Sequence, residues 1–505
     1  MKRTIIWLIA ALITIAACHA QDRSLLSVRR CDAPPVIDGV LGPDEWTGLA
    51  PIGGPALTNG KPARLTFFAG MMYDDAGIYA FCVSEIPDLS ILRAVVKERD
   101  GAVYGDDCYE IFLDPDPDTS MQYFHLVANS IDTHYDGFSK KDSSWNADWR
   151  SKSAVEELED GRGLWTIEIA VPFETLGVSA PEDGATWRFN LCRTWFWKFV
   201  EKGHGPERYI SFAPTASGYH APEKFADLRF VGDGPVAGIV DMPFEVEREA
   251  TFAMWAWSAS QPLVLEVLAS TNKAGQVGGL EGSLPAAQQP DEREKPFVLD
   301  LSGVAETADV TLQVTASDPA SGEVVLRQMS AVRVRPAFEV VLTPLHFAKR
   351  LVVDLDVTRM ADLPQGASAR LQLVQGEMLA EVTVSAEELA DGLARAELSM
   401  TEVEPGGCTV NCRLLGPDKA VIAEQTGRFS VPPRPEWAGN TLGVTDEVLA
   451  PWTPLEVDGE RVACWDRSHD LSGLALPRQI EATGEELLAG PIVLSARVNG
   501  QAGVL

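Results

Sequence analysis

The chain has 505 residues, 46% hydrophobic and 23% charged, a composition typical of folded rather than disordered proteins. At roughly 100–200 residues per domain, this length excludes a single small module and predicts three or four domains. Lys and Arg number 42 against 73 Asp and Glu, so the formal net charge of −31 disfavours nucleic acid and anionic lipid as partners. Neutral ligands, or divalent cations bound by carboxylates, remain compatible with this charge.

Residues 1–20 have the pattern of a bacterial export signal. Two basic residues precede an uncharged apolar run over residues 5–17 that ends in small side chains. Residues 15–18, Ile-Ala-Ala-Cys, resemble a lipobox, which predicts a mature chain that starts at a lipidated Cys18. Ordinary cleavage after Ala20 is the alternative. We expect an exported protein, lipid-anchored in the cell envelope or secreted, that contacts a membrane only through lipid.

The eight cysteines do not form the framework of a disulfide-rich protein. If Cys18 carries lipid, seven remain, so at least one is not paired within the chain. Cys408 and Cys412 lie four residues apart in an extended pattern, which separates their Cα atoms by roughly 13 Å and predicts no bridge between them.

Short alternating segments between turn signals predict that residues 33–231 form a sandwich of two antiparallel sheets. The expected strands are Ala63–Met72, Ile78–Val83, Cys108–Leu113, Tyr123–Asn129, Trp165–Val171, Trp187–Arg193, Tyr209–Phe212 and Leu228–Phe230.

The rest of the chain is also predicted to be β-rich. Residues 236–336 and 337–431 have the pattern of immunoglobulin-like β-sandwich spacers, separated from the first domain by a Gly- and Pro-rich linker at 232–235. Within the first spacer, residues 275–296 are rich in Gly, Ala, Gln and charge and are predicted to be a mobile loop. Prolines at 432–435 precede a last β-rich segment, residues 436–505. The predicted fold class is all-β and multi-domain.

No common catalytic signature is present: the sequence has no phosphate loop, nucleophile elbow, zinc-protease helix or dinucleotide fingerprint. Asp114-Pro-Asp-Pro-Asp118 is similar to a calcium loop but lacks the required Gly at position six and Glu at position twelve. The alternatives are a looser calcium site and a rigid acidic turn, and any metal is left open.

Seven of the 13 tryptophans lie between residues 46 and 197. A sugar offers apolar C–H faces that stack on aromatic rings and hydroxyls that need polar partners, so exposed aromatic residues beside polar groups suit it. Trp46, Trp165 and Trp187 lie in strand patterns and are predicted to be core. The tryptophans in polar loops could either bind a ligand or pack in the core, and the sequence leaves both roles open for Trp145, Trp149, Trp195 and Trp197.

Six ordered blocks resemble the family 9 carbohydrate-binding module. They begin at residues 35, 73, 107, 165, 187 and 222 with Pro-Val-Ile-Asp-Gly, Tyr-Asp-Asp-Ala-Gly, Asp-Cys-Tyr-Glu, Trp-Thr-Ile-Glu, Trp-Arg-Phe-Asn and Pro-Glu-Lys-Phe. The resemblance implies a β-sandwich that holds a poly- or oligosaccharide between two aromatic rings.

Carried onto this sequence, the resemblance places Tyr104 and Tyr219 at the two ring positions and Glu110 at a sugar-binding carboxylate. The family has tryptophan at both ring positions and an arginine on the strand at 123–129, where this chain has none. Arg193, with Asn129 and His125, is the predicted substitute, and Trp145 and Trp197 complete the predicted ligand-binding set. A buried Glu110–Arg193 ion pair without a ligand is the alternative.

The segment 436–505 is more weakly similar to the β-rich start of proteins related to glycoside hydrolase family 123, through motifs such as Pro-Trp-Thr-Pro-Leu at 451–455. The catalytic Asp-Glu pair of those enzymes lies on a downstream barrel, so no catalytic residue is assigned here. The sequence thus predicts extracytoplasmic carbohydrate binding as part of a glycoside hydrolase system, with a catalytic glycosidase domain or subunit as partner. The alternatives are a glycosidase that uses a carboxylate pair and an envelope scaffold that has lost sugar binding.

Overall fold

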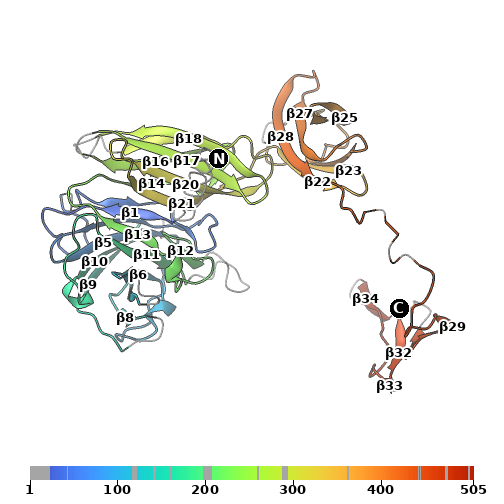
Figure 1. Ribbon diagram of the computed structural model, residues 1–505, viewed down its shortest axis with the longest axis horizontal. Helices are drawn as coiled ribbons and strands as arrows, with labels where there is room; N and C mark the ends of the chain where they lie inside the picture. Colours follow the sequence, from blue (N-terminus) through green and yellow to red (C-terminus); the bar gives the residue numbers. More distant parts are fainter. Residues whose placement is uncertain are drawn as a thin grey trace, which may run out of the picture. The chain divides into compact units, whose positions relative to one another are not determined.

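The computed structural model describes the chain except for residues 1–22, 43, 117–121, 140–143, 160, 197–207, 259–260, 287–293, 361–362, 439, 442, 444, 472–475, 499–500 and 505. Its regular structure consists of β-strands and short 3-10 turns, which confirms the predicted all-β, multi-domain fold class (Figure 1). The chain divides into two compact units, Met1–Pro432 and Pro433–Leu505. No helix among the described residues is long and apolar enough to cross a membrane. The predicted export signal and Cys18 lie outside the described residues.

The N-terminal sandwich packs two sheets face to face. One sheet has the strand order β2 (Ala50–Ile52), β4 (Phe68–Tyr73), β5 (Gly77–Ile86), β10 (Gly163–Pro172) and β9 (Arg150–Glu157). The other runs through β1 (Leu25–Val28), β13 (Ala226–Phe230), β11 (Thr186–Thr194), β6 (Cys108–Asp114), β7 (Phe124–Asn129) and β8 (His134–Phe138), and β11 also pairs with β12 (Tyr209–Ser211). Alternate residues of each strand point into the core between the sheets. Trp46, Trp165 and Trp187 are buried, as predicted.

Every strand predicted for this region has a counterpart, whereas β1, β2, β8, β9 and the two-residue β3 (Ala56–Leu57) were not predicted. Strand β9 reads Arg-Ser-Lys-Ser-Ala-Val-Glu-Glu and lies at an exposed sheet edge, so it lacks the apolar alternation that identifies a strand. Strand β1 is only four residues long.

Strand β1 joins the first sandwich to the second module in one continuous sheet (Figure 1). It pairs in parallel with β13 and antiparallel with β21 (Val324–Val334), which belongs to the second module. The sheet then continues through β20 (Ala308–Ser317), β17 (Leu263–Thr271) and β18 (Gly275–Leu284). One hydrophobic core accordingly runs from Leu26 to Val334.

A three-stranded sheet completes the second module, with the order β14 (Val236–Asp241), β16 (Glu249–Trp257) and β19 (Glu294–Asp300). Strand β14 lies against the first sandwich so closely that a Cβ at Gly238 would be 1.8 Å from the Pro51 carbonyl oxygen. The prediction of a mobile loop over residues 275–296 is wrong for its first half. Strand β18 pairs with β17 from Leu263↔Leu284 to Thr271↔Gly275, and this backbone pairing outweighs the low strand propensity of its glycines.

The third module packs two further sheets around a core of its own. The first consists of β22 (Glu339–Leu345), β23 (Arg350–Asp356) and β26 (Leu393–Ser399), and the second of β25 (Glu377–Val384), β24 (Ser368–Gln375), β27 (Gly406–Leu415) and β28 (Val421–Val431). Cys408 and Cys412 are buried in this core as free thiols, so the prediction that they do not bridge is confirmed.

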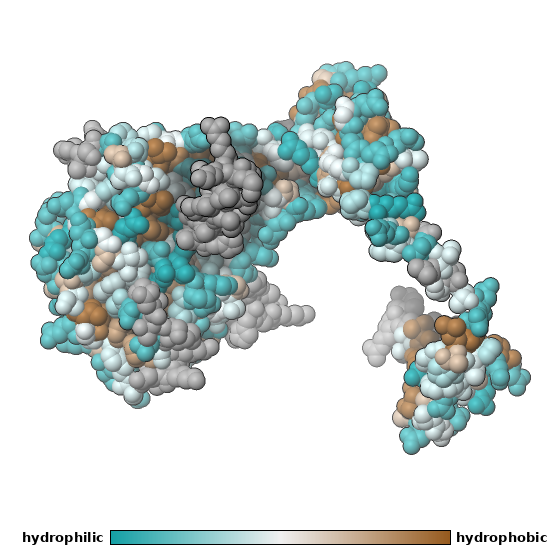
Figure 2. Space-filling view, viewed as in Figure 1, coloured by the Kyte–Doolittle hydropathy of each residue, from teal (hydrophilic) through white to brown (hydrophobic). Residues whose placement is uncertain are grey.

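The second unit is a meander of β29 (Glu456–Asp458), β30 (Arg461–Cys464), β31 (Arg467–Leu471), β32 (Pro477–Ala482) and β33 (Glu485–Glu486), followed by the hairpin β34 (Ser495–Val498) and β35 (Gln501–Val504). Among its described residues no side chain is buried. Trp452 and Trp465 are 61% and 54% exposed, and Figure 2 shows apolar side chains over the surface of this unit. The described part of the unit therefore lacks an apolar core.

Candidate ligand-binding site

The candidate site lies on the face of β6, β7 and β8 that points away from the core between the sheets. Tyr109, Ile111 and Leu113 of β6 point into that core, so Glu110 and Phe112 point the other way. Phe112 is opposite His125 on β7. Val127, the next residue of β7 on this face, is opposite Tyr135 on β8. The strand register thus gathers Glu110, Phe112, His125 and Tyr135 on one face.

Glu110 is buried on this face, and both its carboxylate oxygens are hydrogen-bonded. His125 Nε2 lies 2.8 Å from Glu110 Oε2, with each side chain about 5% exposed or less. The Thr194 hydroxyl donates to Oε1 at 2.8 Å. The carboxylate therefore fixes the orientation of the His125 ring and is itself almost fully shielded from solvent.

A row of four rings extends over this face: Tyr104, Tyr135, His125 and His220. Tyr104 and Tyr135 meet edge to face with their centroids 5.4 Å apart, and the His125 ring lies 5.6 Å from Tyr135 and 5.0 Å from His220. Tyr104 is 49% exposed and His220 is also exposed, whereas Tyr135 is half-buried. We call these four residues the aromatic row.

Buried groups hold the row in place. The His125 ring stacks on Phe112 with a centroid distance of 4.2 Å and an interplanar angle of 10°. The Tyr123 hydroxyl lies 2.7 Å from Nδ1 of His220. Burial, assisted by the nearby Tyr135, raises the pKa of Tyr123 to about 12, so this hydroxyl stays protonated and is able to donate. The row is thus a preorganised surface.

Tyr104 lies on a 3-10 turn, Val103–Gly105, which buried aspartates anchor. Asp106 Oδ2 accepts hydrogen bonds from the backbone N–H groups of residues 95 and 96 and from the Asn129 amide. Asp107 accepts a hydrogen bond from the backbone N–H of Arg93 at 2.7 Å. The predicted site residue Asn129 thus supports the turn that carries Tyr104.

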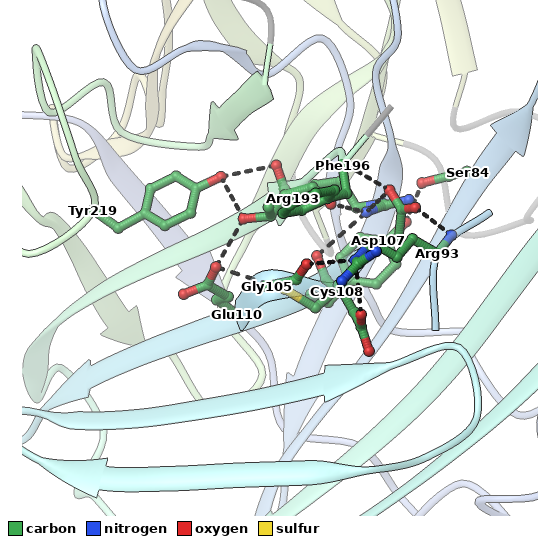
Figure 3. A network of polar contacts seen from close by, with 12 residues as sticks. Ser84, Arg93, Gly105, Asp107, Cys108, Glu110, Arg193, Phe196 and Tyr219 are labelled. Atoms are coloured by element: carbon green, nitrogen blue, oxygen red, sulfur yellow. Dashed lines mark hydrogen bonds and ion pairs between the residues drawn. The ribbon is translucent and has the colours of Figure 1, made fainter. Parts of the chain in front are cut away.

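The second predicted ring, Tyr219, is buried at 5% exposure. Its hydroxyl donates to the Arg193 carbonyl oxygen at 2.8 Å (Figure 3). Its ring packs against Tyr209 and Phe112. Burial raises the pKa of the Tyr219 hydroxyl well above its usual value. Tyr104 and Tyr219 therefore differ in environment: one belongs to the exposed aromatic row and the other to the packing around Phe112.

Arg193 lies on the opposite face of the sheet from Glu110. In the β6–β11 register Arg193 is opposite Tyr109, while Glu110 is opposite Cys192. The guanidinium is fully buried, stacked over Trp195 at 3.9 Å, with Nη1 3.5 Å from Asp107. The alternative of a Glu110–Arg193 ion pair is wrong, because a register offset of one residue sends the two side chains to different faces.

The remaining tryptophans either pack inside the sandwich or lie outside the described residues. Trp145 is partly buried and packs on Phe124 at a centroid distance of 4.8 Å, and Trp149 and Trp195 are buried. Trp197 lies outside the described residues, as does part of the proposed calcium loop after Asp116. No group of three or more His, Cys, Asp or Glu side chains suited to a metal ion occurs in the described part of the chain.

The prediction missed Tyr135 and His220. Tyr135 alternates with Gly137 in a short polar segment that was not identified as a strand, and His220 directly follows Tyr219. The arrangement as a whole offers ring faces, phenol hydroxyls and imidazole nitrogens on one surface. These groups suit a ligand that combines apolar C–H faces with hydroxyls.

No family model matches the chain, and no curated protein matches it. Solved structures similar to it include a candidate carbohydrate-binding protein from Bacteroides uniformis, with 17% identity over 41% of this chain and all of that one, at a TM-score of 0.32. A family 9 carbohydrate-binding module from Caldicellulosiruptor kristjanssonii in complex with cellotriose is 17% identical over 41% of this chain and 94% of its own, at a TM-score of 0.29. The module from that organism in complex with glucose is 18% identical over 41% and 96%, at a TM-score of 0.29.

Proposed function

We propose that the N-terminal sandwich binds carbohydrate on the aromatic row. The observation that carries this proposal is the half-exposed Tyr104 ring, held edge to face against Tyr135 at one end of a row of preorganised rings. A pyranose C–H face would cover Tyr104, while its hydroxyls would bond to the phenol oxygens and to the imidazole of His220. In this arrangement Glu110 orients His125 rather than contacting the sugar.

The six sequence blocks that resemble family 9 carbohydrate-binding modules support the same proposal, because one of them forms strand β6, which carries Glu110 and Phe112 beside the row. We further propose that the protein is exported and acts as the sugar-binding part of a glycoside hydrolase system. The export pattern at residues 1–20 and the motifs in segment 436–505 support this extension.

A glycan-array screen of the full chain tests the proposal, with Tyr104→Ala beside the unsubstituted protein. About half of a tyrosine surface of roughly 200 Å² is exposed at Tyr104, and a bound sugar ring would cover about half of that. At about 25 cal/mol/Å², roughly 50 Å² corresponds to about 1.2 kcal/mol, so we expect the Kd to rise close to tenfold.

Phe347→Ala is the matched control, since Phe347 is an exposed aromatic residue of the third module, 75% exposed. It should bind like the unsubstituted chain. A folded protein that binds no glycan would overturn the proposal in favour of a scaffold without ligand. If the Tyr104→Ala protein binds glycans as tightly as the unsubstituted chain, the binding site is not the aromatic row.

The glycosidase alternative is tested with Glu110→Gln. If the unsubstituted chain hydrolyses a bound glycan and Glu110→Gln abolishes this activity, the glycosidase alternative is favoured. Both Glu110 oxygens are already bonded to His125 and Thr194, which is the arrangement of a supporting carboxylate, so we expect no hydrolysis by this residue.

A further inference from the structure

Four arginines from three modules line one open hollow of about 520 Å³ in the first unit. Arg64 comes from the first sandwich, Arg333 and Arg335 from the second module, and Arg359 from the third. Three carboxylates line it as well, and Asp356 pairs with Arg359 at 3.4 Å, so the charges of the arginines and these carboxylates balance in a chain whose net charge is −31. Four arginines gathered where three modules meet, in a chain this acidic, indicate a site that admits an anion.

Two of the arginines have close carboxylate partners. Arg333 Nε lies 2.8 Å from Asp309, and Arg359 Nη2 lies 2.6 Å from Glu339. Glu339 also accepts a hydrogen bond from the Thr307 backbone N–H at 2.6 Å, which joins the second module to the third. Burial acts to raise the pKa of Glu339, but its bonds to Thr307 and Arg359 outweigh burial and lower it. These pairs form a fixed, internally neutralised frame.

Arg64 and Arg335 have weaker partners. The guanidinium of Arg335 approaches Glu245 only to 3.8 Å, and the two side chains are 49% and 38% exposed. Arg64 is exposed and lies over the Phe244 ring at 5.3 Å, and no ion pair joins it to a carboxylate among the described residues. Each guanidinium carries five N–H donors in a planar fork, which matches the oxygens of a carboxylate or sulfate.

We infer that this hollow binds the oxyanion of an acidic saccharide, a carboxylate or sulfate group held between Arg64 and Arg335. The saccharide part of this inference rests on the proposed function, whereas the oxyanion part rests on the two arginines alone. A volume of about 520 Å³ lies in the range of small-ligand sites and accommodates a sugar unit. Because both arginines are exposed, the binding is sensitive to salt.

Isothermal titration of the full chain tests the inference. The probes are digalacturonate, a sulfated disaccharide, the matching neutral disaccharide and inorganic sulfate. We expect the acidic sugars to bind more tightly than the neutral one, and added salt to weaken only this preference. The double variant Arg64→Ala, Arg335→Ala should weaken acidic-sugar binding more than about tenfold, the loss of one or more charged hydrogen bonds.

Two further variants make the result specific. The lysine pair Arg64→Lys, Arg335→Lys keeps the charge without the fork and should retain part of the affinity. Arg350→Ala removes a half-exposed arginine of the third module that pairs with Glu397, and it should bind like the unsubstituted chain. An equal affinity for acidic and neutral sugars, or a preference that survives the double alanine variant, would overturn the inference. Inorganic sulfate that binds as tightly as the sugars would overturn its saccharide part.

The two proposals fail independently. Tyr104→Ala should weaken the binding of neutral sugars on the aromatic row and leave the binding of acidic sugars in the hollow intact. If acidic sugars bind in a way that depends on Arg64 and neutral glycans do not bind, the proposal for the aromatic row is rejected and the inference for the hollow stands. If neutral sugars bind in a way that depends on Tyr104 and acidic sugars bind no more tightly, the proposal for the aromatic row stands and the inference for the hollow is rejected.

Discussion

Replacing Glu110 by alanine tests whether its carboxylate is a buried support. The substitution would leave the buried His125 ring and the Thr194 hydroxyl without the partners they now have at 2.8 Å. Leaving a buried polar group without its hydrogen-bond partner costs about 1–3 kcal/mol, and the two groups together correspond to about 2–6 kcal/mol. We expect the free energy of opening of β6 and β7 to fall by that amount.

Hydrogen exchange followed by mass spectrometry measures this opening locally, which suits a chain of several modules whose unfolding is not two-state. A loss of about 2–6 kcal/mol accelerates exchange of the β6 and β7 amides by roughly thirty-fold to more than ten-thousand-fold. Glu110→Gln keeps an acceptor oxygen for one of the two partners and should cost less. Glu156→Ala on exposed β9 is the control and should change little. An acceleration of less than about tenfold in Glu110→Ala would refute the buried-support interpretation.

Three further predictions concern other parts of the first unit. Burial, assisted by the neighbouring Arg99, lowers the pKa of His134 to about 4, so the unfolded chain binds its proton first and stability should fall from about pH 6.5 towards pH 4; His134→Gln should flatten this fall in thermal-melting curves. Gly238→Ala should cost about 3 kcal/mol or more in chemical denaturation, because the new Cβ overlaps the Pro51 carbonyl. Arg193→Met should melt above Arg193→Ala, because it refills the space between the aromatic rings.

Each of these three has a result that contradicts it. An unchanged pH dependence in His134→Gln would mean that other groups govern the acid response. Wild-type stability in Gly238→Ala would show that β14 does not lie close against the first sandwich. Equal melting of the two Arg193 variants would show that packing of this side chain contributes little.

Local sequence patterns predicted most of the strands, because alternation of apolar and polar residues is itself a local signal. They did not predict β1, whose importance lies in pairing with Asp227 on one side and Arg327 on the other, some two hundred and three hundred residues away. They also failed at β18, a glycine-rich strand held by its partner rather than by propensity. Long-range pairing leaves no trace in a short window of sequence.

The candidate site shows the same division. Motifs placed Tyr104, Glu110 and His125 in one region, and the structure puts all three on one face of the sheet. The face occupied by Arg193 depends on a pairing register that no motif encodes, and a difference of one residue decides it. Tyr135 was missed for a related reason, since its strand is polar and became recognisable only through its pairing with β7.

The predicted ligand-binding residues therefore fall into two physical classes that binding measurements can separate. Tyr104 offers an exposed ring, so its loss should change affinity without changing stability. Asn129 and Arg193 bond to Asp106 and Asp107, which follow the turn that carries Tyr104. Their loss should lower stability and affinity together, because a ligand would then have to order that turn on binding. Residues identified by family motifs are thus a mixture of contacts and supports, and the joint change in Kd and melting temperature assigns each to its class.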